Sequence, residues 1–212
     1  MKKFIFVALI ALGFAFSANA QKVGFGVQLG GNLSGISEDP ETADLSTKLG
    51  FQLGGFIDYS LTKDFFLKGG LLFITKGASY EETNSGAKVS LTMNPMYIQV
   101  PIVIGYGFNV SDNFKIYANV GPYIAYGLGG KVTTEISGTG TVLDGETSAD
   151  FFTDDVSKFD FGARLGLGIE LNKKIIIGFD YDLGLLNMNT GDNSDDYSVK
   201  NYTMGLTLGY RF

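Results

Sequence analysis

The 212-residue chain contains neither cysteine nor histidine. Without cysteine, the protein can form no disulfide bond and cannot carry a lipid on an N-terminal cysteine. Without histidine, Ser-His-Asp and Cys-His catalysis are excluded, and so are zinc or haem sites that depend on imidazole ligands. We therefore expect a protein that is not an enzyme and that holds no metal and no cofactor.

Basic residues and proline are also scarce. The chain has 16 lysines and arginines against 22 aspartates and glutamates, and its isoelectric point is about 4.6. This acidic balance argues against nucleic acid as a partner. Only 4 prolines accompany 30 glycines, so glycine is about twice as frequent as its usual ~7%. No repeat or low-complexity segment accounts for this, and a flexible linker does not explain it.

Long apolar runs are absent except at the start of the chain. Two lysines precede an apolar stretch over residues 4–16, and an A-x-A pattern ends at Ala20. These features are typical of a secretory signal peptide, which we assign to residues 1–20. The stretch is too short to cross a membrane as a helix, which takes about 20 apolar residues. The mature chain, residues 21–212, is predicted to form one domain with a formal charge of −8, once the two lysines are removed from the total of −6.

The mature chain instead shows alternation of apolar and other residues. Residues 23–34 read VGFGVQLGGNLS, with Gly24, Gly26 and Gly30 on the face opposite the apolar side chains. A period of two is typical of a strand with one apolar face. A glycine-rich phosphate loop would need a helix after it, but an acidic loop and another alternating segment follow. We interpret these glycines as the inward face of a strand, kept bare so that neighbouring side chains fit.

The alternation returns seven more times, which predicts eight strands and no helix after the signal peptide. We place the strands at residues 23–34, 48–59, 66–80, 97–108, 114–129, 158–171, 175–188 and 200–212. Short turns (60–64, 109–113 and 172–174) alternate with long acidic loops (35–47, 81–95, 130–157 and 189–199). Short turns at one rim and long loops at the other are the layout of an outer-membrane barrel. The predicted fold is all-β, an eight-stranded antiparallel up-and-down transmembrane β-barrel.

The composition of the two strand faces favours a membrane barrel over a secreted soluble one, which also has eight alternating strands. A soluble barrel turns its polar face to water, where glycine weakens a strand. Here glycine and a few charges dominate that face, as suits a crowded lumen, and the other face is almost entirely Leu, Ile, Val, Phe and Tyr. In lipid, a closed barrel pairs every backbone polar group without helices.

Several segments also resemble a known family. They are 96–108 (MYIQVPIVIGYGF), 118–129 (ANVGPYIAYGLG), 159–171 (FDFGARLGLGIEL) and the C-terminal LTLGYRF. With the signal peptide, they resemble the PorT-like "porin family" outer-membrane β-barrel domain over essentially all of the mature chain. This resemblance implies an outer-membrane location and little about activity, because functions in the family are diverse. Leu208, Tyr210 and Phe212 resemble the alternating aromatic signal by which barrel assembly machinery recognises its clients.

The interior of an eight-stranded barrel is just wide enough for side chains to fill. Unpaired charge there would be costly, so a balanced network is expected. The inward-facing charges are Lys68, Lys76, Lys115, Arg164 and Arg211 against Asp58, Asp160, Glu170, Asp180 and Asp182. The side chains expected to fill the remaining space are Phe56, Leu72, Ile74, Tyr117 and Tyr123.

The turns predict how some of these charges meet. If the 172–174 turn is centred on Lys173, Arg164 lies opposite Asp182 and diagonal to Asp180. Asp58 should likewise meet Lys68 across the turn that follows its strand. The network is either structural or a gated narrow ion path along Arg164, Asp180 and Asp182. Paired carboxylates can also perform acid–base chemistry, but a lumen without a cleft leaves a substrate no place to bind.

The four long loops carry a combined charge of −13. Solvation alone explains such loops; the alternatives are cations that bridge lipopolysaccharide, or a surface for adhesion. Asp192, Ser194 and Asp196 have a calcium-like oxygen spacing, but Tyr197 stands where an EF-hand needs glycine, so we predict no metal site there.

The longest loop, 130–157, has Thr-rich edges. Val132–Ile136 and Thr139–Leu143 could extend strands above the bilayer. Both are too short to cross it, since a spanning strand takes about 9–11 residues. A ten-stranded barrel is therefore not expected.

Two functions remain open from the sequence. The first is a structural or surface-interaction protein with a filled lumen, or an accessory to an envelope machine such as a secretion apparatus. The second is a narrow channel or transporter for ions or small apolar solutes. In either case we expect an integral outer-membrane protein with both termini periplasmic and the long loops extracellular. Its expected partners are membrane lipid, lipopolysaccharide and, during insertion, the barrel assembly machinery.

Overall fold

A computed structural model describes residues 22–39, 45–84, 87–138, 145–191 and 194–212. The predicted signal peptide lies outside these residues and stays a prediction. The described residues form ten strands and no helix long and apolar enough to cross a membrane. The strands are β1 (Val23–Asp39), β2 (Ser46–Ser60), β3 (Phe65–Thr75), β4 (Ala78–Asn84), β5 (Ala87–Ser111), β6 (Phe114–Gly138), β7 (Gly145–Asp150), β8 (Phe159–Leu171), β9 (Ile175–Gly184) and β10 (Ser198–Arg211).

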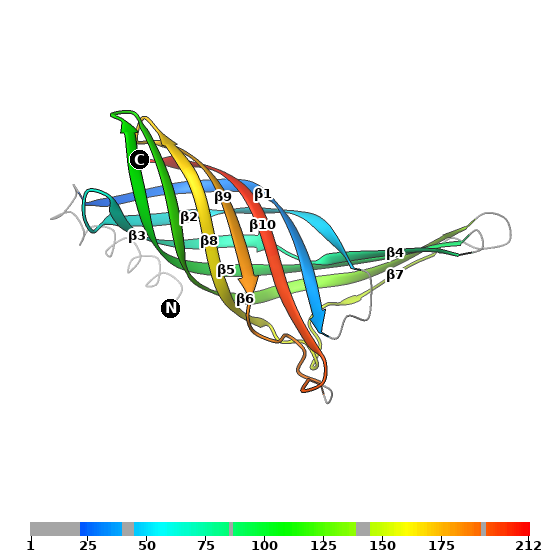
Figure 1. Ribbon diagram of the computed structural model, residues 1–212. Coiled ribbons are helices and arrows are strands. Elements are labelled where there is room, and N and C mark those ends of the chain that lie inside the picture. Colours follow the sequence, from blue (N-terminus) through cyan, green and yellow to red (C-terminus); the bar gives the residue numbers. More distant parts are fainter. Residues whose placement is uncertain (1–21, 40–44, 85–86, 139–144, 192–193) are drawn as a thin grey trace, which may run out of the picture.

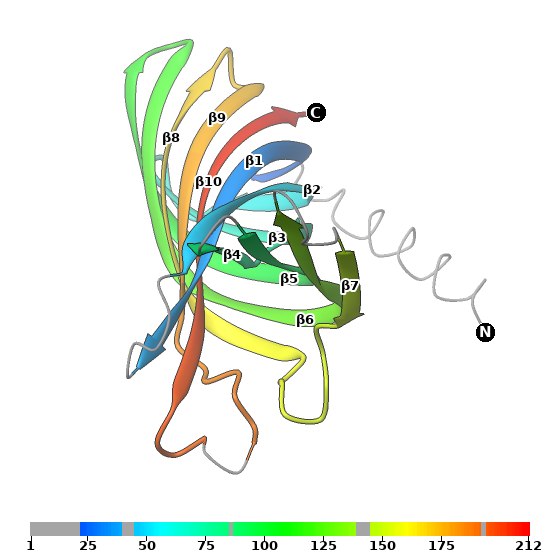
Figure 2. The same ribbon diagram turned by 90° about the vertical axis from the view of Figure 1, so that its right-hand side faces the viewer.

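Eight of these strands form a closed antiparallel ring. Its order is β1, β2, β3, β5, β6, β8, β9 and β10, and β10 pairs back with β1 (Figures 1 and 2). Short turns join β2 to β3, β5 to β6 and β8 to β9 at one end of the ring, which we name the short-turn end. The other end is the long-loop end. The predicted all-β, eight-stranded barrel is confirmed.

Two predicted strands are interrupted in the structure. The strand expected over 66–80 divides into β3 and β4 at Gly77, which has φ of +133°, a conformation that only glycine adopts readily. A Cβ at this position would also collide with the carbonyl oxygen of Met93. The strand expected over 175–188 ends at Gly184, and residues 185–188 are not part of a strand.

The predicted loops 81–95 and 130–157 are largely strands, so this part of the prediction was wrong. β5 and β6 have 25 residues each and run far past the rest of the ring. β4 pairs with β5 and β7 pairs with β6, which gives a four-stranded extension (Figure 1). We name it the protruding sheet: β4, β7, residues 87–95 of β5 and residues 130–138 of β6.

The Thr-rich segments have different outcomes. Val132–Ile136 extends β6 beyond the ring, as predicted. Thr139–Leu143 lies outside the described residues. β4 and β7 add strands to the sheet without entering the ring, so the barrel itself keeps eight strands.

Two prolines interrupt the hydrogen-bonded ladders on both sides of β5. Between β3 and β5, pairing stops after Gly69–Ile102 and resumes at Leu72–Gln99, around Pro101. Between β5 and β6, pairing stops at Tyr123 and resumes at Val120, around Pro122. Proline has no N–H to donate to a ladder. Around Pro101, β5 therefore makes fewer backbone hydrogen bonds to its two neighbours than a regular strand does.

The outer wall of the ring is an apolar belt, as the alternation predicts. Side chains that are about half or more exposed include Leu29, Leu53, Ile104, Leu167 and Leu206, and Leu206 is 63% exposed. Soluble monomers rarely expose contiguous apolar surface of this extent. A tall outward apolar band is the lipid-facing surface of a membrane barrel.

Candidate functional site: the barrel lumen

Nine of the ten predicted lumen charges stand on the inward-facing rows of their strands, and Lys76 reaches the interior from the break between β3 and β4. Six of the ten are buried: Asp58, Lys76, Asp160, Arg164, Glu170 and Asp182. Lys68, Lys115, Asp180 and Arg211 are partly buried. Strand alternation fixes the inward direction of the nine side chains on strands, whereas the closed barrel decides which of the charges meet.

Arg164 and Asp182 form the central ion pair. They are register partners across β8 and β9, as the predicted turn requires. Asn172 and Lys173 have φ of 52° and 60° and form the tight hairpin that sets this register. Arg164 Nε donates to Asp182 Oδ1 at 2.6 Å and Nη2 donates to Oδ2 at 2.7 Å, a bidentate geometry. Gln99 Nε2 also donates to Asp182, at 2.7 Å.

A second buried pair lies nearer the long-loop end. Lys76 Nζ donates to Asp160 Oδ2 at 2.8 Å, and both side chains have no exposure. Asn201 donates to the same oxygen at 3.1 Å. The ammonium of Lys76 lies 4.6 Å from the ring centroid of Tyr123 and 5.2 Å from that of Tyr97. This pair joins residues 84 apart in the sequence, and no local spacing could have matched them.

At the short-turn end, Arg211 binds two carboxylates. Its guanidinium lies 2.8 Å from Asp58 Oδ2 and 2.7 Å from Glu170 Oε2. Lys68 is the register partner of Asp58, as predicted, but its ammonium lies over the ring of Phe56 at 4.3 Å. Asp58 pairs with arginine because the guanidinium fork can bind two carboxylates at once.

Apolar and aromatic side chains close the lumen between these charges. Leu72, Ile74, Tyr97 and Tyr123 are at most 1% exposed. Phe56 and Tyr117, also predicted to fill the interior, pack with Phe66 and Ile176 nearer the short-turn end. The predicted fillers all lie inside the barrel.

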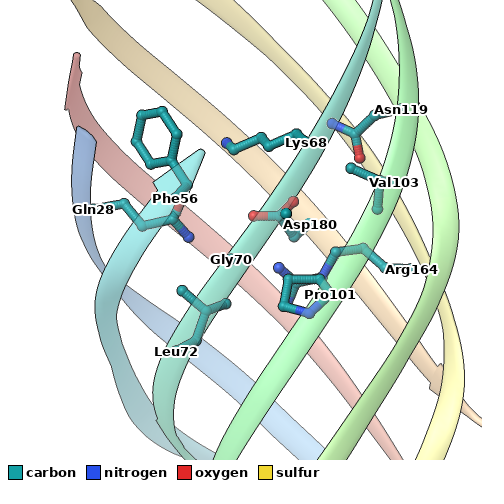
Figure 3. Close-up of a pocket in the computed structure, with 11 residues that line it drawn as sticks. Gln28, Phe56, Lys68, Gly70, Leu72, Pro101, Val103, Asn119, Arg164 and Asp180 are labelled. Carbon is teal, nitrogen blue, oxygen red and sulfur yellow. The ribbon is translucent and has the colours of Figure 1, made fainter. Parts of the chain in front are cut away.

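Two small cavities remain among the charged residues. One, of about 20 Å³, is lined by Lys68, Arg164, Asp180 and neighbouring residues (Figure 3). The other, of about 60 Å³, lies between Lys68, Lys115 and Arg211. Since one water needs roughly 10–15 Å³, the first has room for about one water and the second for a few. Neither of these two cavities has room for a solute larger than a few waters.

The comparisons with known proteins agree with this geometry. Residues 19–190 match the family model described as outer membrane protein beta-barrel domain. The chain belongs to this family. Its location is therefore the outer membrane, and the PorT-like label is a finer resemblance that this match does not test. Among curated proteins, no sequence matches the chain significantly.

Several solved structures are similar to this family member at low identity. Ail, the attachment invasion locus protein of Yersinia pestis, is 19% identical, with 90% of this chain and 99% of Ail covered and a TM-score of 0.41. Neisserial surface protein A (NspA) is 14% identical, with 88% and 95% covered and a TM-score of 0.42. OprG from Pseudomonas aeruginosa is 12% identical, with 90% and 97% covered and a TM-score of 0.38.

Near the long-loop end, the outer-membrane barrel holds buried polar residues that sequence reasoning did not single out. Asn32, Ser34, Gln52 and Thr203 are at most 3% exposed, and each has a side-chain atom without a hydrogen-bond partner in the described part of the chain. They lie on the adjacent strands β10, β1 and β2. On β1 and β2 these residues alternate with the apolar ones, so the sequence predicts that they face inward. Because their side chains are neutral, the search for paired charges did not include them.

Residues from the long loops cap the same end of the outer-membrane barrel. Phe152 packs edge-on against Tyr97, with ring centroids 5.6 Å apart. The hydroxyl of Tyr97 contacts Met188 Sδ at 3.6 Å, and Met188 is 1% exposed. Phe152 lies in segment 130–157, which was predicted to be a polar loop, and Met188 was placed at the end of the predicted strand over 175–188. An apolar pair such as Phe151-Phe152 inside an acidic loop is the signal that could have found them.

The glycines of β1 make room for this interior. A Cβ at Gly26 would collide with the ring of Phe56, and one at Gly24 would lie 2.6 Å from Asp58 Oδ1. The next element among the described residues is β2, a strand that pairs with β1. These positions therefore serve the packing of the lumen and not the binding of phosphate.

The proposed assembly signal lies on the outside of the barrel. Leu208, Tyr210 and Phe212 are all exposed, and Phe212 is 65% exposed. The ring of Phe212 contacts Tyr210 and Phe25, each at 5.7 Å. A recognition signal must be accessible in this way, but its role stays a prediction. The possible calcium motif includes Asp192, which lies outside the described residues; within them, no cluster of acidic residues could hold a metal.

Proposed function

We propose that this outer-membrane protein is closed to solutes and presents the protruding sheet at the cell exterior as an interaction surface. The length of β5 and β6 carries this proposal. A spanning strand takes about 9–11 residues, and each of these strands has 25. More than half of each strand is therefore available outside the bilayer.

The surface of the protruding sheet suits contact with a partner. β7 pairs with β6 alone among the described residues, so its second edge keeps unpaired backbone groups. All six residues of β7 are exposed, including Glu146 and Asp150. An open, acidic strand edge can bind an extended segment of another chain through main-chain hydrogen bonds. A partner with a basic strand fits this edge best.

The proposed orientation puts the short-turn end and both termini in the periplasm and the long-loop end outside. Because the chain has no cysteine, single cysteines can test it. We expect Thr147→Cys on β7 to react with a membrane-impermeant maleimide in intact cells, and Lys173→Cys to react only after the membrane is permeabilised. The reverse pattern would contradict the orientation.

A photo-crosslinker at the same two positions tests the partner. Crosslinks at position 147 to extracellular or surface proteins, identified by mass spectrometry, are the expected outcome. Crosslinks at position 173 alone, to components of a secretion apparatus, would support the accessory role in its place. We assign the chain no catalytic role. It lacks histidine, and four lumen carboxylates form ion pairs with lysine or arginine side chains: Asp58, Asp160, Glu170 and Asp182.

A narrow channel for ions or small apolar solutes is the second candidate. The interrupted ladders around Pro101 favour it, because the cavity of about 20 Å³ reaches the barrel wall there. The closure by Leu72, Ile74, Tyr97 and Tyr123 favours the first candidate. We expect refolded protein to show no steady conductance in planar bilayers. A steady conductance that Arg164→Ala abolishes and Lys173→Ala leaves intact would overturn the closed barrel.

A further inference from the structure

A groove of about 560 Å³ lies on the outer wall where the protruding sheet leaves the ring. Leu49, Phe51 and Met96 line its apolar part, and all three are outward-facing members of the apolar belt. Asn94 stands two residues before Met96 on the same face of β5 and pairs with Lys131, which pairs in turn with Asp150. Lys131 and Asp150 therefore border the groove just beyond the end of the belt.

Two lysines give this groove its charge. Lys48 of β2 and Lys131 of β6 line it together, and among the described residues neither takes part in an ion pair. Lys48 Nζ donates to the carbonyl oxygen of Leu49 at 3.2 Å. Asp150 is the one carboxylate lining the groove. The groove is thus lined by two lysines and one aspartate, a net positive charge. The long loops at the same end of the barrel have a combined charge of −13.

We propose that this groove binds a phosphorylated, acylated glycolipid of the outer leaflet. Its phosphate would lie on Lys48 and Lys131, and its acyl chains on Leu49, Phe51 and Met96. Ammonium–phosphate contacts are charge-assisted and are among the stronger hydrogen bonds. Lysine stems also cover apolar surface while their amines reach the headgroup region. The inference rests on the proposed function only for orientation, since the groove must face the outer leaflet.

Native mass spectrometry of the refolded full chain in detergent tests the site without reference to orientation. The probes are diphosphoryl lipid A, the same lipid with both phosphates removed, phosphatidylglycerol and inorganic phosphate. We expect the diphosphoryl lipid to bind at least about tenfold more tightly than the dephosphorylated one, the effect of losing one charge-assisted contact. The double variant Lys48→Gln/Lys131→Gln should lose about the same factor.

Two further variants keep the proposal falsifiable. Lys173→Gln/Lys174→Gln removes the same charge at the short-turn end and should leave binding within about twofold. Asp150→Asn removes the carboxylate beside Lys131 and should tighten binding. Equal loss in both double variants, equal binding of the dephosphorylated lipid or of phosphatidylglycerol, or equal binding of inorganic phosphate would each overturn the glycolipid site. Because these measurements use detergent, a failure of the cysteine labelling would leave them unchanged.

Discussion

Single residues in the lumen matter through their buried charge. Arg164 and Asp182 are 4% and 2% exposed and bind each other through two hydrogen bonds. The desolvation of two ions offsets much of their attraction, so such a pair contributes little net stability. Removing one partner is different, because it leaves a buried charge without compensation.

Arg164→Ala is therefore expected to lower the free energy of unfolding by about 3–5 kcal/mol, measured by urea titration in detergent or lipid. The double variant Arg164→Met/Asp182→Leu should recover most of that loss, because it removes both charges and keeps the volume filled. A single variant as stable as the double would contradict the account of the pair. Gln99, which also donates to Asp182, is the residue that the double variant leaves without its partner.

At the scale of elements, one glycine decides where the barrel ends and the protruding sheet begins. Gly77 combines φ of +133° with no space for a Cβ beside Met93. Next to it, Lys76 N donates to the carbonyl oxygen of Pro95 at 2.9 Å and holds the bend against β5. The break between β3 and β4 is thus built into the backbone.

Gly77→Ala should destabilise the protein by about 1–3 kcal/mol, the usual cost of a strained backbone position. Limited proteolysis should show earlier cleavage in β4 and the adjoining part of β5. Gly69→Ala is the matched control, because the nearest atom to its Cβ would be 4.0 Å away. If both variants unfold alike, the bend at Gly77 is not what positions the sheet.

The end of β10 carries a second prediction at this scale. If Phe212 is part of an assembly signal, Phe212→Ala should reduce the amount of protein inserted in the outer membrane of cells and leave refolding in detergent unchanged. Phe25→Ala removes the same ring contact and serves as the control for packing. Equal losses from the two variants in cells would assign the effect to packing and not to recognition.

For the whole molecule, the apolar belt is what separates a membrane barrel from a soluble one. Leu206 lies in the middle of β10, 63% exposed, between Gly31 of β1 and Phe179 of β9. An exposed position on a soluble protein tolerates most substitutions within about 0.5 kcal/mol. A position facing the middle of a bilayer does not.

Leu206→Arg is expected to cost about 2–4 kcal/mol of unfolding free energy in lipid, the penalty for arginine near the bilayer midplane. Thr147→Arg, on the exposed β7, should cost little under the same conditions. Both are measured by denaturant titration of protein refolded into vesicles. A neutral effect of Leu206→Arg would mean that the belt does not face lipid.

The sequence by itself determined the class of fold and the inward direction of the lumen side chains that its strands carry, because a strand's period of two is a local property. It also placed Arg164 opposite Asp182, since a short turn fixes register directly. The prediction of strand ends failed for β5 and β6. Both strands continue beyond the apolar belt, into segments that were predicted to be long acidic loops.

Only the tertiary structure decided which charges meet across the lumen. Lys76 and Asp160 are 84 residues apart, and Arg211 joins Asp58 and Glu170 from separate strands. These pairings depend on the stagger of all eight strands around the ring, which no single turn sets. The same stagger, with the bend at Gly77, brings Lys48 and Lys131 to one groove from strands that do not pair.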